Sequence, residues 1–521
     1  MNQPAPPPQK AASTSKVWGW FPRLPVWGQA CVAFVIGVFA AFGQAPFDNP
    51  LVMLLALIMG FVMMRRQSRP MRAAFTGWSF GFGYFALALV WILHPFQVDA
   101  DRYAWMAPFA LLFLSAGLAL FWGLAFWAAR RLSSRTWPLV LTWTAAEMLR
   151  AYVFTGFPWA SPSQALINGM AGQILAWFGP HGAMLWLCAT AWVLSFPALR
   201  TGRVPLRLAQ SAVLISVSIL ILVPPRAAPS EVTGFTVRLV QPNIDQTEKW
   251  QSEKLLAFFD RHLSLTTAPP AEAGMTPDLV VWPETAIPWQ LDDAAPSLAQ
   301  MSVAAGTAPL VFGVLRREGL NRFNSLAVLE PGGTVSQTYD KHHIVPFGEY
   351  IPMAGILGKF GLKGLAAEDG AGYAKGPGAQ VLSLGKLGLA LPLICYEAVF
   401  AQDVNAAPRR VDFIVQVTND AWFGKDAGPQ QHLAQARMRA IEQGLPLMRS
   451  ANTGISAMID PRGRVTHALA LGEMGFVDAP LPKPLAPTLY SRTGDGPLAV
   501  WLALVLAVAA VWSTKGTRKR N

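Results

Sequence analysis

Cys395 stands where an apolar strand pattern ends. Residues 380–400 read as an apolar strand, a Gly-Lys hairpin and a second apolar strand, and the pattern stops at Cys395, Tyr396 and Glu397. A thiol at the exit of a strand is held on a stiff element and can be reached from one side, as a nucleophile must be. The alternative is a small buried hydrophobic residue, because free cysteines are among the most buried residue types. The choice between the two depends on the partners that other segments supply.

Two other segments offer the partners that a nucleophilic thiol needs, which are a base for its proton and a positive charge. Glu284 ends the apolar run VVWPE, and a carboxylate at such a strand end is a candidate general base. Lys341 follows a strand and precedes an irregular loop, where its ammonium is placed to stabilise an oxyanion by about 3 kcal/mol. A surface strand cap for Glu284 and a solvated loop charge for Lys341 are the alternatives. In an α/β sheet, strand ends can converge on one rim, so we expect the three side chains to meet there.

The composition indicates a membrane protein. Of the 521 residues, 53% are hydrophobic and only 14% are charged, which is far more apolar than average soluble usage. The three cysteines, Cys31, Cys188 and Cys395, are too few and too scattered for a framework of disulfides or zinc ligands. The net charge of +12 raises the question of nucleic acid. Loops between apolar segments account for the basic residues, so no nucleic acid partner is expected.

Eight apolar segments lie near the length of roughly 20 residues that spans a membrane. They cover residues 26–43, 50–64, 74–94, 104–129, 136–153, 177–197, 208–224 and 496–513. The short segment at 50–64 either spans beside a tilted neighbour or re-enters the membrane. Residues 1–25 are rich in Pro, Gln and Ser and are expected to form a disordered leader.

Basic residues cluster in alternate loops, which predicts the orientation of the chain. The second, fourth and sixth segments are followed by Arg65, Arg66, Arg69, Arg72, Arg130, Arg131, Arg135, Arg200, Arg203 and Arg207. In the loops at 95–103 and 156–176 the only Lys or Arg is Arg102. By the positive-inside rule the leader and the basic tail at 514–521 are cytoplasmic, and the polar segment at 226–495 lies on the outer side.

The polar segment at 226–495 predicts a layered α/β domain. Strands are expected at 235–243, 278–284, 309–315, 325–330, 380–394 and 412–420, and helices at 248–266 and 430–443. Strands that alternate with helices, some of them joined by hairpins, favour a sandwich with mixed sheets. The glycine-rich stretch at 355–377 is expected to form either mobile lids or plain surface loops.

Three motifs resemble the Glu-Lys-Cys signature of the nitrilase superfamily: WPET around Glu284, YDKHHIVPFGEY around Lys341 and CYE at Cys395. Together with the apolar segments, the runs TNDAWFG, QHLAQARMRAIEQGLPLMRSANTG and EMLRAYVFTGFPW resemble the membrane-embedded branch of that superfamily, the apolipoprotein N-acyltransferases of Gram-negative bacteria. The resemblance runs from the first apolar segment to the last and shows no departure at the three motif residues. It implies a multi-span α-helical membrane domain joined to a nitrilase-like αββα sandwich.

The resemblance also implies a reaction. Glu284 would take the proton of Cys395, the thiolate would attack the sn-1 ester of a phospholipid, and Lys341 with the Tyr396 N–H would stabilise the oxyanion. The free α-amine of a lipoprotein's N-terminal diacylglyceryl-cysteine would then attack the thioester in a ping-pong cycle. The implied partners are a phospholipid acyl donor, a diacylated apolipoprotein and the lipid bilayer, with no metal and no organic cofactor. The expected protein is a monomer in a bacterial inner membrane with its catalytic domain in the periplasm.

Further candidate positions come from the same resemblance. Glu349 would orient Lys341, while Tyr396, Glu397 and Trp250 would surround the acyl and amine sites. Glu349 and Glu397 stand next to apolar runs, so they are expected to be paired inside the protein. Trp250 has an alternative place in the aromatic belt of the membrane interface.

Glu147 and Arg150 stand three residues apart in an apolar segment, hence on one helix face. Charges inside a span are costly and are candidates for function, although a purely structural pair is an equal alternative. The loop that follows, VFTGFPWASPSQ, is apolar and aromatic and is expected to form a lipid-facing floor of the cleft. Asn419, in the TNDAWFG run, completes the candidate site residues.

The histidines favour no metal site. His342 and His343 are neighbours, so they would point to opposite faces of a strand. His432 begins a helix in which Ala436 occupies the position of a second ligand one turn later.

Two other functions stay open on the residues alone. A membrane-tethered amidase or nitrilase would use the same three residues to pass an acyl group to water, although a single span would anchor it. A transporter or receptor with an outer binding domain predicts broken paired helices or inverted repeats, which we do not find in the sequence.

Overall fold

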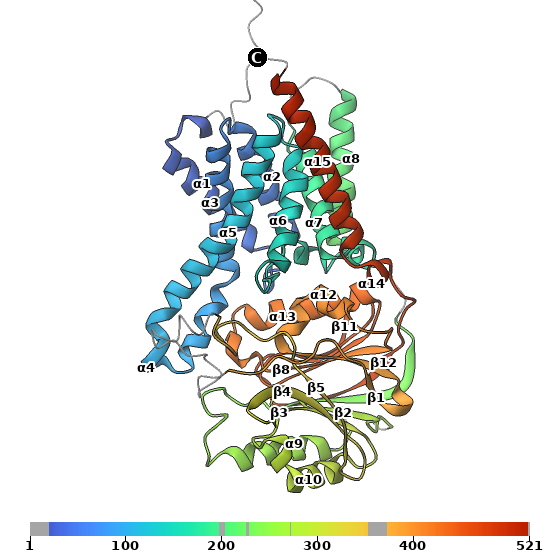
Figure 1. The fold of residues 1–521 in the computed structure, drawn as a ribbon. Helices are drawn as coiled ribbons and strands as arrows, with labels where there is room; N and C mark the ends of the chain where they lie inside the picture. Colours follow the sequence, from blue (N-terminus) through green and yellow to red (C-terminus); the bar gives the residue numbers. More distant parts are fainter. Residues whose placement is uncertain are drawn as a thin grey trace, which may run out of the picture.

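A computed structural model describes residues 20–196, 204–225, 229–270, 272, 274–352 and 372–518. Most of the expected leader, Arg200, Arg203, most of the glycine-rich stretch and the last tail residues lie outside this range. The described chain forms a helical bundle stacked on a sheet domain (Figure 1). The bundle comes from the first 225 residues and the C-terminal helix, and the sheet domain from the polar segment between them.

All eight expected apolar segments are helical in the structure. The helices are α1 (Val26–Ala41), α2 (Pro50–Arg66), α3 (Pro70–Ala88), α5 (Ala107–Leu132), α6 (Pro138–Tyr152), α7 (Leu175–Leu194), α8 (Val204–Leu222) and α15 (Gly496–Arg518). Among the described residues, three stretches are long and apolar enough to cross a membrane: Ala100–Leu132, Met170–Leu194 and Gly496–Ser513. The pair Pro70–Ala88 and Val90–Gln97, bent by 61°, makes a fourth if it counts as one span. These helices confirm a membrane protein, and eight full crossings stay a prediction.

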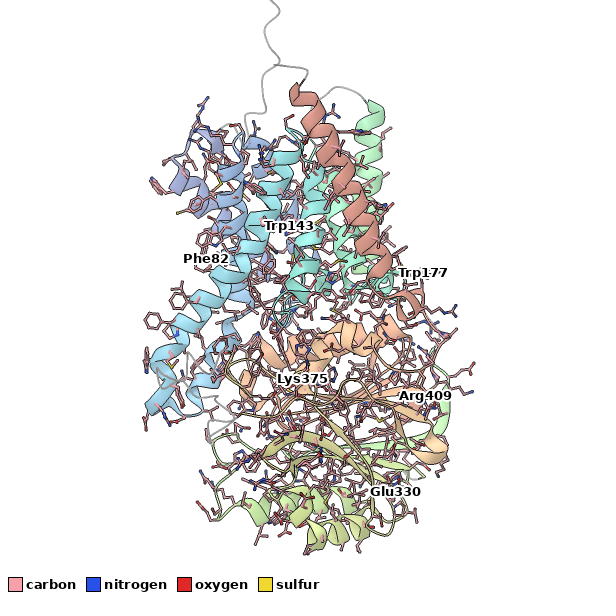
Figure 2. All side chains as sticks on the ribbon, in the orientation of Figure 1. Phe82, Trp143, Trp177, Glu330, Lys375 and Arg409 are labelled. Atoms are coloured by element: carbon pink, nitrogen blue, oxygen red, sulfur yellow. The ribbon has the colours of Figure 1, made fainter. Side chains whose placement is uncertain are left out.

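Aromatic side chains fill the inside of the bundle. The rings of Trp122 and Trp143 lie edge to face with their centroids 4.9 Å apart, and Phe80 packs against both. In Figure 2 the labelled aromatic residues Phe82, Trp143 and Trp177 lie among the helices, and the labelled charged residues Glu330, Lys375 and Arg409 lie in the sheet domain. The bundle is therefore the apolar part of the molecule and the sheet domain the charged part.

Helices α1 and α3 approach each other through two glycines. A Cβ atom at Gly37 would lie 2.0 Å from the carbonyl oxygen of Phe80, and one at Gly83 would lie 2.0 Å from that of Phe34. Small residues at such positions allow helix backbones to pack closely in a membrane, where apolar burial alone does not drive association.

Two six-stranded sheets build the other domain. The first has the order β12 (Gly475–Pro482), β1 (Val232–Gln241), β2 (Leu279–Val281), β3 (Leu310–Glu318), β4 (Asn321–Leu329), β5 (Val335–Asp340). The second has the order β11 (Val465–Leu469), β10 (Ser456–Ile459), β9 (Leu447–Ala451), β8 (Phe413–Thr418), β7 (Leu389–Ile394), β6 (Leu382–Ser383). Each sheet has a parallel centre, β1-β2-β3 in one and β7-β8-β9 in the other, with antiparallel strands outside it. The expected mixed sheets are confirmed.

The sheets face each other, and helices cover their outer faces. Successive residues of a strand point to opposite faces, so Leu239 in β1 joins the core between the sheets while Val240 packs towards Phe259 of α9 (Leu255–Thr267). Helix α10 (Ala295–Ala305) lies beside α9, and α12 (Ala401–Asn405) and α13 (Gly428–Gln443) cover the second sheet (Figure 1). This arrangement is the expected αββα sandwich.

The helix expected at 248–266 starts later than its pattern indicated. It begins at Leu255, and residues 246–250 form turns instead. The side chain of Lys249 is buried, and its Nζ donates to the carbonyl oxygen of Glu284 at 3.2 Å. The tertiary contact therefore fixes this segment in a non-helical path.

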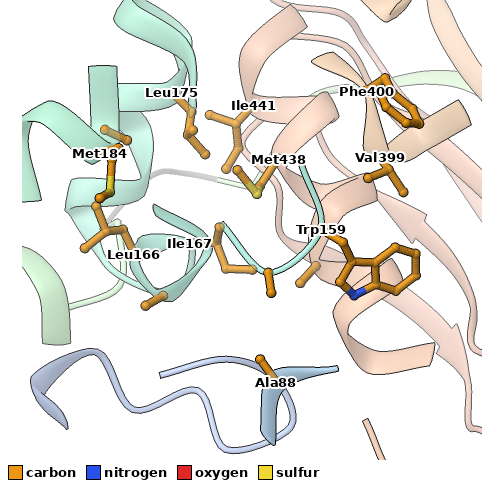
Figure 3. Packing of buried hydrophobic residues seen from close by; sticks show 14 of the residues in the cluster. Ala88, Trp159, Leu166, Ile167, Leu175, Met184, Val399, Phe400, Met438 and Ile441 are labelled. Atoms are coloured by element: carbon orange, nitrogen blue, oxygen red, sulfur yellow. The ribbon is translucent and has the colours of Figure 1, made fainter. Parts of the chain in front are cut away.

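Helix α13 lies between the second sheet and the bundle. Ala436 and Ala440 belong to the cluster that packs on the sheet, whereas Met438 and Ile441 pack with Leu175 of the bundle (Figure 3). Of its 16 residues 13 are buried. The bundle and the sheet domain thus share one apolar core through this helix.

We predict that Gly83→Leu destabilises the bundle by about 1–3 kcal/mol, because the new side chain meets the α1 backbone, which cannot move aside alone. Gly117→Leu is the matched control, since a Cβ at Gly117 on α5 has no neighbour within 4 Å. Thermal unfolding of the purified proteins in detergent, followed by tryptophan fluorescence, makes the comparison. Equal midpoints for the two variants would show that the close approach of α1 and α3 is unimportant.

Candidate active site

Three strand exits meet in the space between the two sheets. Glu284 follows β2, and Lys341 and Cys395 come directly after β5 and β7; the three side chains are buried, at 6%, 1% and 6% exposure. Nζ of Lys341 lies 3.7 Å from Oε1 of Glu284. The charge of Glu284 raises the pKa of the nearby Cys395 thiol, and the charge of Lys341 lowers it. The structure therefore brings together the three residues that the motifs singled out.

The carboxylate of Glu284 is held on both oxygens. Oε1 accepts a hydrogen bond from Nδ2 of Asn324 at 2.6 Å, and Oε2 accepts one from the main-chain N–H of Asn419 at 2.8 Å. Behind it, Thr285 has a φ of 46°, a left-handed conformation that costs a non-glycine residue roughly 1–3 kcal/mol. Lys249 stabilises this turn, because its Nζ contacts both the Glu284 carbonyl and the Thr285 hydroxyl. Burial lowers the pKa of Lys249 to about 8.

Lys341 is a buried cation with two carboxylate partners. Its Nζ donates to Oε1 of Glu349 at 2.8 Å, and Glu349 in turn accepts from Asn324 at 3.2 Å and from the Val345 N–H at 2.8 Å. Burial alone would lower the pKa of Lys341, but Glu349 and Glu284 outweigh it and raise the pKa above its ordinary value. The side chain is therefore a fixed ammonium that can donate to an oxygen bearing negative charge.

The thiol of Cys395 is neutral at rest. Burial raises its pKa, the negative charge of Glu284 raises it further, and Lys341 offsets only part of this. A neutral thiol beside a carboxylate can give up its proton as it attacks, which is the arrangement that general-base catalysis requires. The backbone at Cys395 is left-handed, with a φ of 49°. Such strain persists only where the surrounding contacts fix the conformation.

Glu397 is fully buried and ties the Cys395 corner to the loop after Lys341. Its Oε1 accepts from the main-chain N–H groups of His342 at 2.8 Å and His343 at 3.2 Å, and its Oε2 accepts from that of Ile394 at 2.7 Å. Burial opposes the ionisation of Glu397, but the side chain of His342, whose Nδ1 lies 2.9 Å from Oε1, and the Ile394 N–H lower its pKa. The expectation that Glu349 and Glu397 are paired inside the protein agrees with the structure.

The two aromatic candidates differ in exposure. Tyr396 is buried, with its ring edge to face against Phe400 at 4.9 Å between centroids. Trp250 is 46% exposed, and its ring lies 5.7 Å from Nζ of Lys249. Trp250 therefore lies on the turn whose Lys249 contacts the Glu284 carbonyl, and it is about half exposed.

Asn419 directly contacts the site, whereas Glu147 and Arg150 do not. The Asn419 side chain donates to Gln246 at 2.7 Å while its N–H holds Glu284. Glu147 and Arg150 form a buried pair at 2.6 Å, and Arg150 donates to the carbonyl oxygens of Phe157 and Trp159. This geometry fits the structural alternative, in which the pair fixes the loop between the bundle and the sheet domain. A cavity of about 20 Å³, enough for one water molecule, lies between this pair and α13.

Several buried polar residues at the site escaped the sequence analysis. Asn324, in the middle of β4, bridges Glu284 and Glu349. His432 was considered only as a metal ligand, yet its ring lies between Asp420 and the carbonyl oxygen of Cys395. The QHLAQ run contains His432 and the TNDAWFG run contains Asp420, but nothing in their spacing indicates that these two residues touch. In the described part of the chain, no group of three or more His, Cys, Asp or Glu side chains is arranged to hold a metal ion.

Comparisons with known proteins agree with this architecture. Residues 236–486 match the carbon-nitrogen hydrolase family, and residues 36–193 match the apolipoprotein N-acyltransferase N-terminal domain. The chain is 38% identical to the apolipoprotein N-acyltransferase of Sinorhizobium fredii, over 95% of this chain and 97% of that protein. It is 36% identical to that of Rhodopseudomonas palustris, over 94% and 95%. A crystal structure of a CN-hydrolase superfamily protein from Xanthomonas campestris aligns with a TM-score of 0.35 and 20% identity, over 51% of this chain and 96% of that one.

We predict that the reaction of the free Cys395 thiol with methyl methanethiosulfonate, measured after pretreatment of the protein with neutral hydroxylamine, accelerates about tenfold per pH unit between pH 7 and 9, because a raised pKa leaves little thiolate in that range. Glu284→Gln should shift the profile to lower pH, since it removes a negative charge that raises the thiol pKa. Mass spectrometry of quenched samples gives the rates, and Cys395→Ser gives the background of Cys31 and Cys188. A plateau below pH 8 in the parent protein would instead indicate a preformed ion pair of thiolate and Lys341.

Proposed function

The chain belongs to the apolipoprotein N-acyltransferase family, and we propose that it transfers the sn-1 acyl chain of a phospholipid to the α-amine of a lipoprotein's N-terminal diacylglyceryl-cysteine. The protein is an acyltransferase of the membrane, and its substrates are lipoproteins and phospholipids.

The first half of the reaction loads the enzyme. Glu284 takes the thiol proton of Cys395 as the sulfur attacks the ester carbonyl, and a carbon–sulfur bond forms. The oxyanion is stabilised by the Lys341 ammonium and the main-chain N–H of Tyr396. The ester carbon–oxygen bond then breaks, and Glu284 returns the proton to the departing lysophospholipid oxygen. A thioester remains on Cys395.

The second half transfers the acyl group. The free amine of the diacylglyceryl-cysteine attacks the thioester, so that a carbon–nitrogen bond forms and the carbon–sulfur bond breaks. Glu284 accepts a proton from the attacking nitrogen and passes it to the thiolate of Cys395, which restores the resting thiol. Conversion of a thioester into an amide is downhill and drives the cycle. No step requires a metal or an organic cofactor.

The observation that carries this proposal is the position of the buried Lys341 ammonium, 2.8 Å from Glu349 and 3.7 Å from Glu284, where it also acts on the Cys395 thiol. Glu349 keeps the ammonium in place while Glu284 gains and loses its proton. Glu397 and Tyr396 fix the corner that carries the thiol, and Asn419 holds Glu284. Trp250, half exposed on the turn above Glu284, is placed to contact an acyl chain.

The bundle favours a lipid substrate over the small amide that a tethered amidase would hydrolyse. Gln402, close to Cys395 in sequence, donates to the carbonyl oxygen of Ala151 at 3.0 Å, and His343 Nε2 lies 3.1 Å from that of Thr155. Both partners belong to the end of α6 and its following loop, where Phe154 is fully exposed. An apolar side chain there supports a lipid-facing floor beside the site, as the loop sequence predicts.

The proposed orientation places the sheet domain in the periplasm and both termini in the cytoplasm of a bacterial inner membrane. It rests on the basic residues, because Arg65 and Arg66 end α2 and Arg69 directly precedes α3, at the end of the bundle away from the sheets. A single chain contains all of the proposed residues, so we propose that the protein acts as a monomer.

We predict that Cys395 carries a fatty-acyl adduct in protein purified from membranes. Glu284→Gln should lower the adduct by at least about 100-fold, because the thiol then lacks its base. Intact-protein and peptide mass spectrometry detect the adduct as a mass gain removed by neutral hydroxylamine. An unmodified Cys395 in active wild-type protein would contradict the thioester mechanism.

Purified protein with labelled phospholipid and a synthetic diacylated lipopeptide separates transfer from hydrolysis. Transfer yields an N-acylated lipopeptide, and Cys395→Ser should abolish it. Free fatty acid without an acylated amine would instead select the amidase or nitrilase alternative. Arg409→Ala on the sheet domain surface, away from the site, is the control and should keep full activity.

We predict that a membrane-impermeant maleimide labels Leu320→Cys in spheroplasts, because Leu320 is fully exposed at the β3–β4 turn of the sheet domain. Met71→Cys, at the start of α3 and 72% exposed, should be labelled only after lysis. The parent protein reports the background of its native cysteines. The reverse pattern would overturn the proposed orientation.

A further inference from the structure

The main-chain carbonyl of Cys395 lies against two buried side chains other than Glu284 and Lys341. Nε2 of His432, at the start of α13, lies 3.0 Å from this oxygen. Nε2 of Gln416, on β8, donates to it at 3.3 Å. Both side chains are fully buried, and Gln416 Nε2 also lies 3.2 Å from His432 Nε2. The imidazole, the amide and the carbonyl thus form one closed cluster.

This carbonyl shares a rigid peptide unit with the N–H of Tyr396. The peptide group is planar, and in the trans form its C=O and N–H point in opposite directions. A contact that fixes the carbonyl therefore fixes the direction of the N–H. The left-handed backbone at Cys395, with a φ of 49°, is disfavoured. Without a clamp, the peptide unit would relax to another orientation.

We infer that Gln416 and His432 are positioning residues that aim the Tyr396 N–H at the developing oxyanion: the Gln416 amide holds the carbonyl of Cys395, and His432 holds that amide. The inference rests on the proposed function, in which this N–H and Lys341 are the two oxyanion donors. Neither residue touches the reacting atoms. Their effect is confined to the direction of one donor.

Charged residues behind His432 keep its ring in place. Nδ1 lies 2.9 Å from Oδ1 of Asp420, whose other oxygen accepts from Arg449 Nη2 at 2.5 Å. Although burial opposes ionisation, Arg449 and His432 lower the pKa of Asp420 to about 2. Asp420 therefore accepts from the Nδ1–H of His432, and Thr418 donates to the same Oδ1 at 3.0 Å. Burial lowers the pKa of His432, so its Nε2 has no proton and accepts from the Gln416 amide, which donates its other hydrogen to the Cys395 carbonyl.

The same turn of α13 is anchored to the bundle. Gln431 accepts from Nε1 of Trp159 at 2.7 Å and donates to the carbonyl oxygens of Ala45 at 3.1 Å and Ala88 at 3.0 Å. The Trp159 ring also lies 5.5 Å from that of His432, between centroids. Trp159 and Ala88 appear in the junction cluster of Figure 3. The clamp on the Cys395 peptide is thus braced by the membrane helices as well as by the sheet.

His432→Phe and His432→Gln test the inference, because phenylalanine keeps the ring without a polar atom and glutamine can place an amide near the Nε2 position. Two rates are measured: kcat and KM for acyl transfer to the lipopeptide, and the rate of Cys395 with methyl methanethiosulfonate, which has no carbonyl and needs no oxyanion donor. His467→Phe, on the outer strand β11 and hydrogen bonded only to Thr466 among the described residues, is the matched control.

We expect His432→Phe to lower kcat about 10- to 100-fold with KM within about twofold, because a misaimed donor weakens only the transition state. The thiosulfonate rate should stay within about threefold of the parent rate, and His432→Gln should recover at least about a third of the lost kcat on a logarithmic scale. Thermal midpoints identify a folding defect, and Gln416→Met then serves as the second variant with the same expected split.

Three results would overturn the inference alone: an unchanged kcat in folded His432→Phe and Gln416→Met, a thiosulfonate rate that falls in step with kcat, or a glutamine variant no better than the phenylalanine one. A wild-type protein that leaves the lipopeptide unmodified would overturn the proposed function, and this inference with it.

Discussion

A buried ammonium between two carboxylates is the constraint on which the site depends. Unpaired charges inside a protein cost several kcal/mol each, so Lys341, Glu284 and Glu349 can be buried only together, at 2.8 and 3.7 Å. The remaining lone pairs need donors, and Asn324 and the Asn419 N–H supply them. Burial and the negative charge of Glu284 raise the pKa of the Cys395 thiol, and Lys341 offsets only part of this. One electrostatic arrangement therefore accounts for the polar residues around the site and for the resting state of the sulfur.

Both sides of the site are built on left-handed corners. Thr285, directly after Glu284, and Cys395 itself have φ values of 46° and 49°. Each corner has its own buried brace: Lys249 contacts the first, and His432 with Gln416 contacts the second. A strained backbone can be kept only if neighbouring groups determine it more strongly than local preference does. The αββα sandwich meets this condition. It brings the two left-handed residues and the buried side chains that hold them into the space between its sheets or directly outside it.

Local patterns in the sequence were sufficient for the apolar helices, for the strands of the first sheet up to Lys341 and for the three strand exits. The eight apolar helices, the strands before Glu284, Lys341 and Cys395, and the helix at α13 all follow from periodicity and length. Asn324, His432 and Gln416 could not be found in this way. The residues that they contact, Glu284 or Cys395, lie 21 to 40 residues away in the sequence, and only the tertiary fold brings them close. The late start of α9 has the same origin, since a single buried contact of Lys249 overrides the helical pattern of residues 248–254. Strands β9 to β12 contain polar residues among their apolar ones, and the sequence analysis did not predict them as strands.

Helix α13 has no face of its own turned to water. Its alanines pack against the sheet, and its larger apolar side chains pack against the membrane helices. Of its 16 residues, 13 are buried. A sheet domain separated from the membrane helices would expose Met438, Ile441, Val399 and Phe400 as one apolar patch. Such a fragment would bind detergent or lipid or would self-associate. The catalytic domain is therefore expected to stay soluble only while it is attached to the membrane helices.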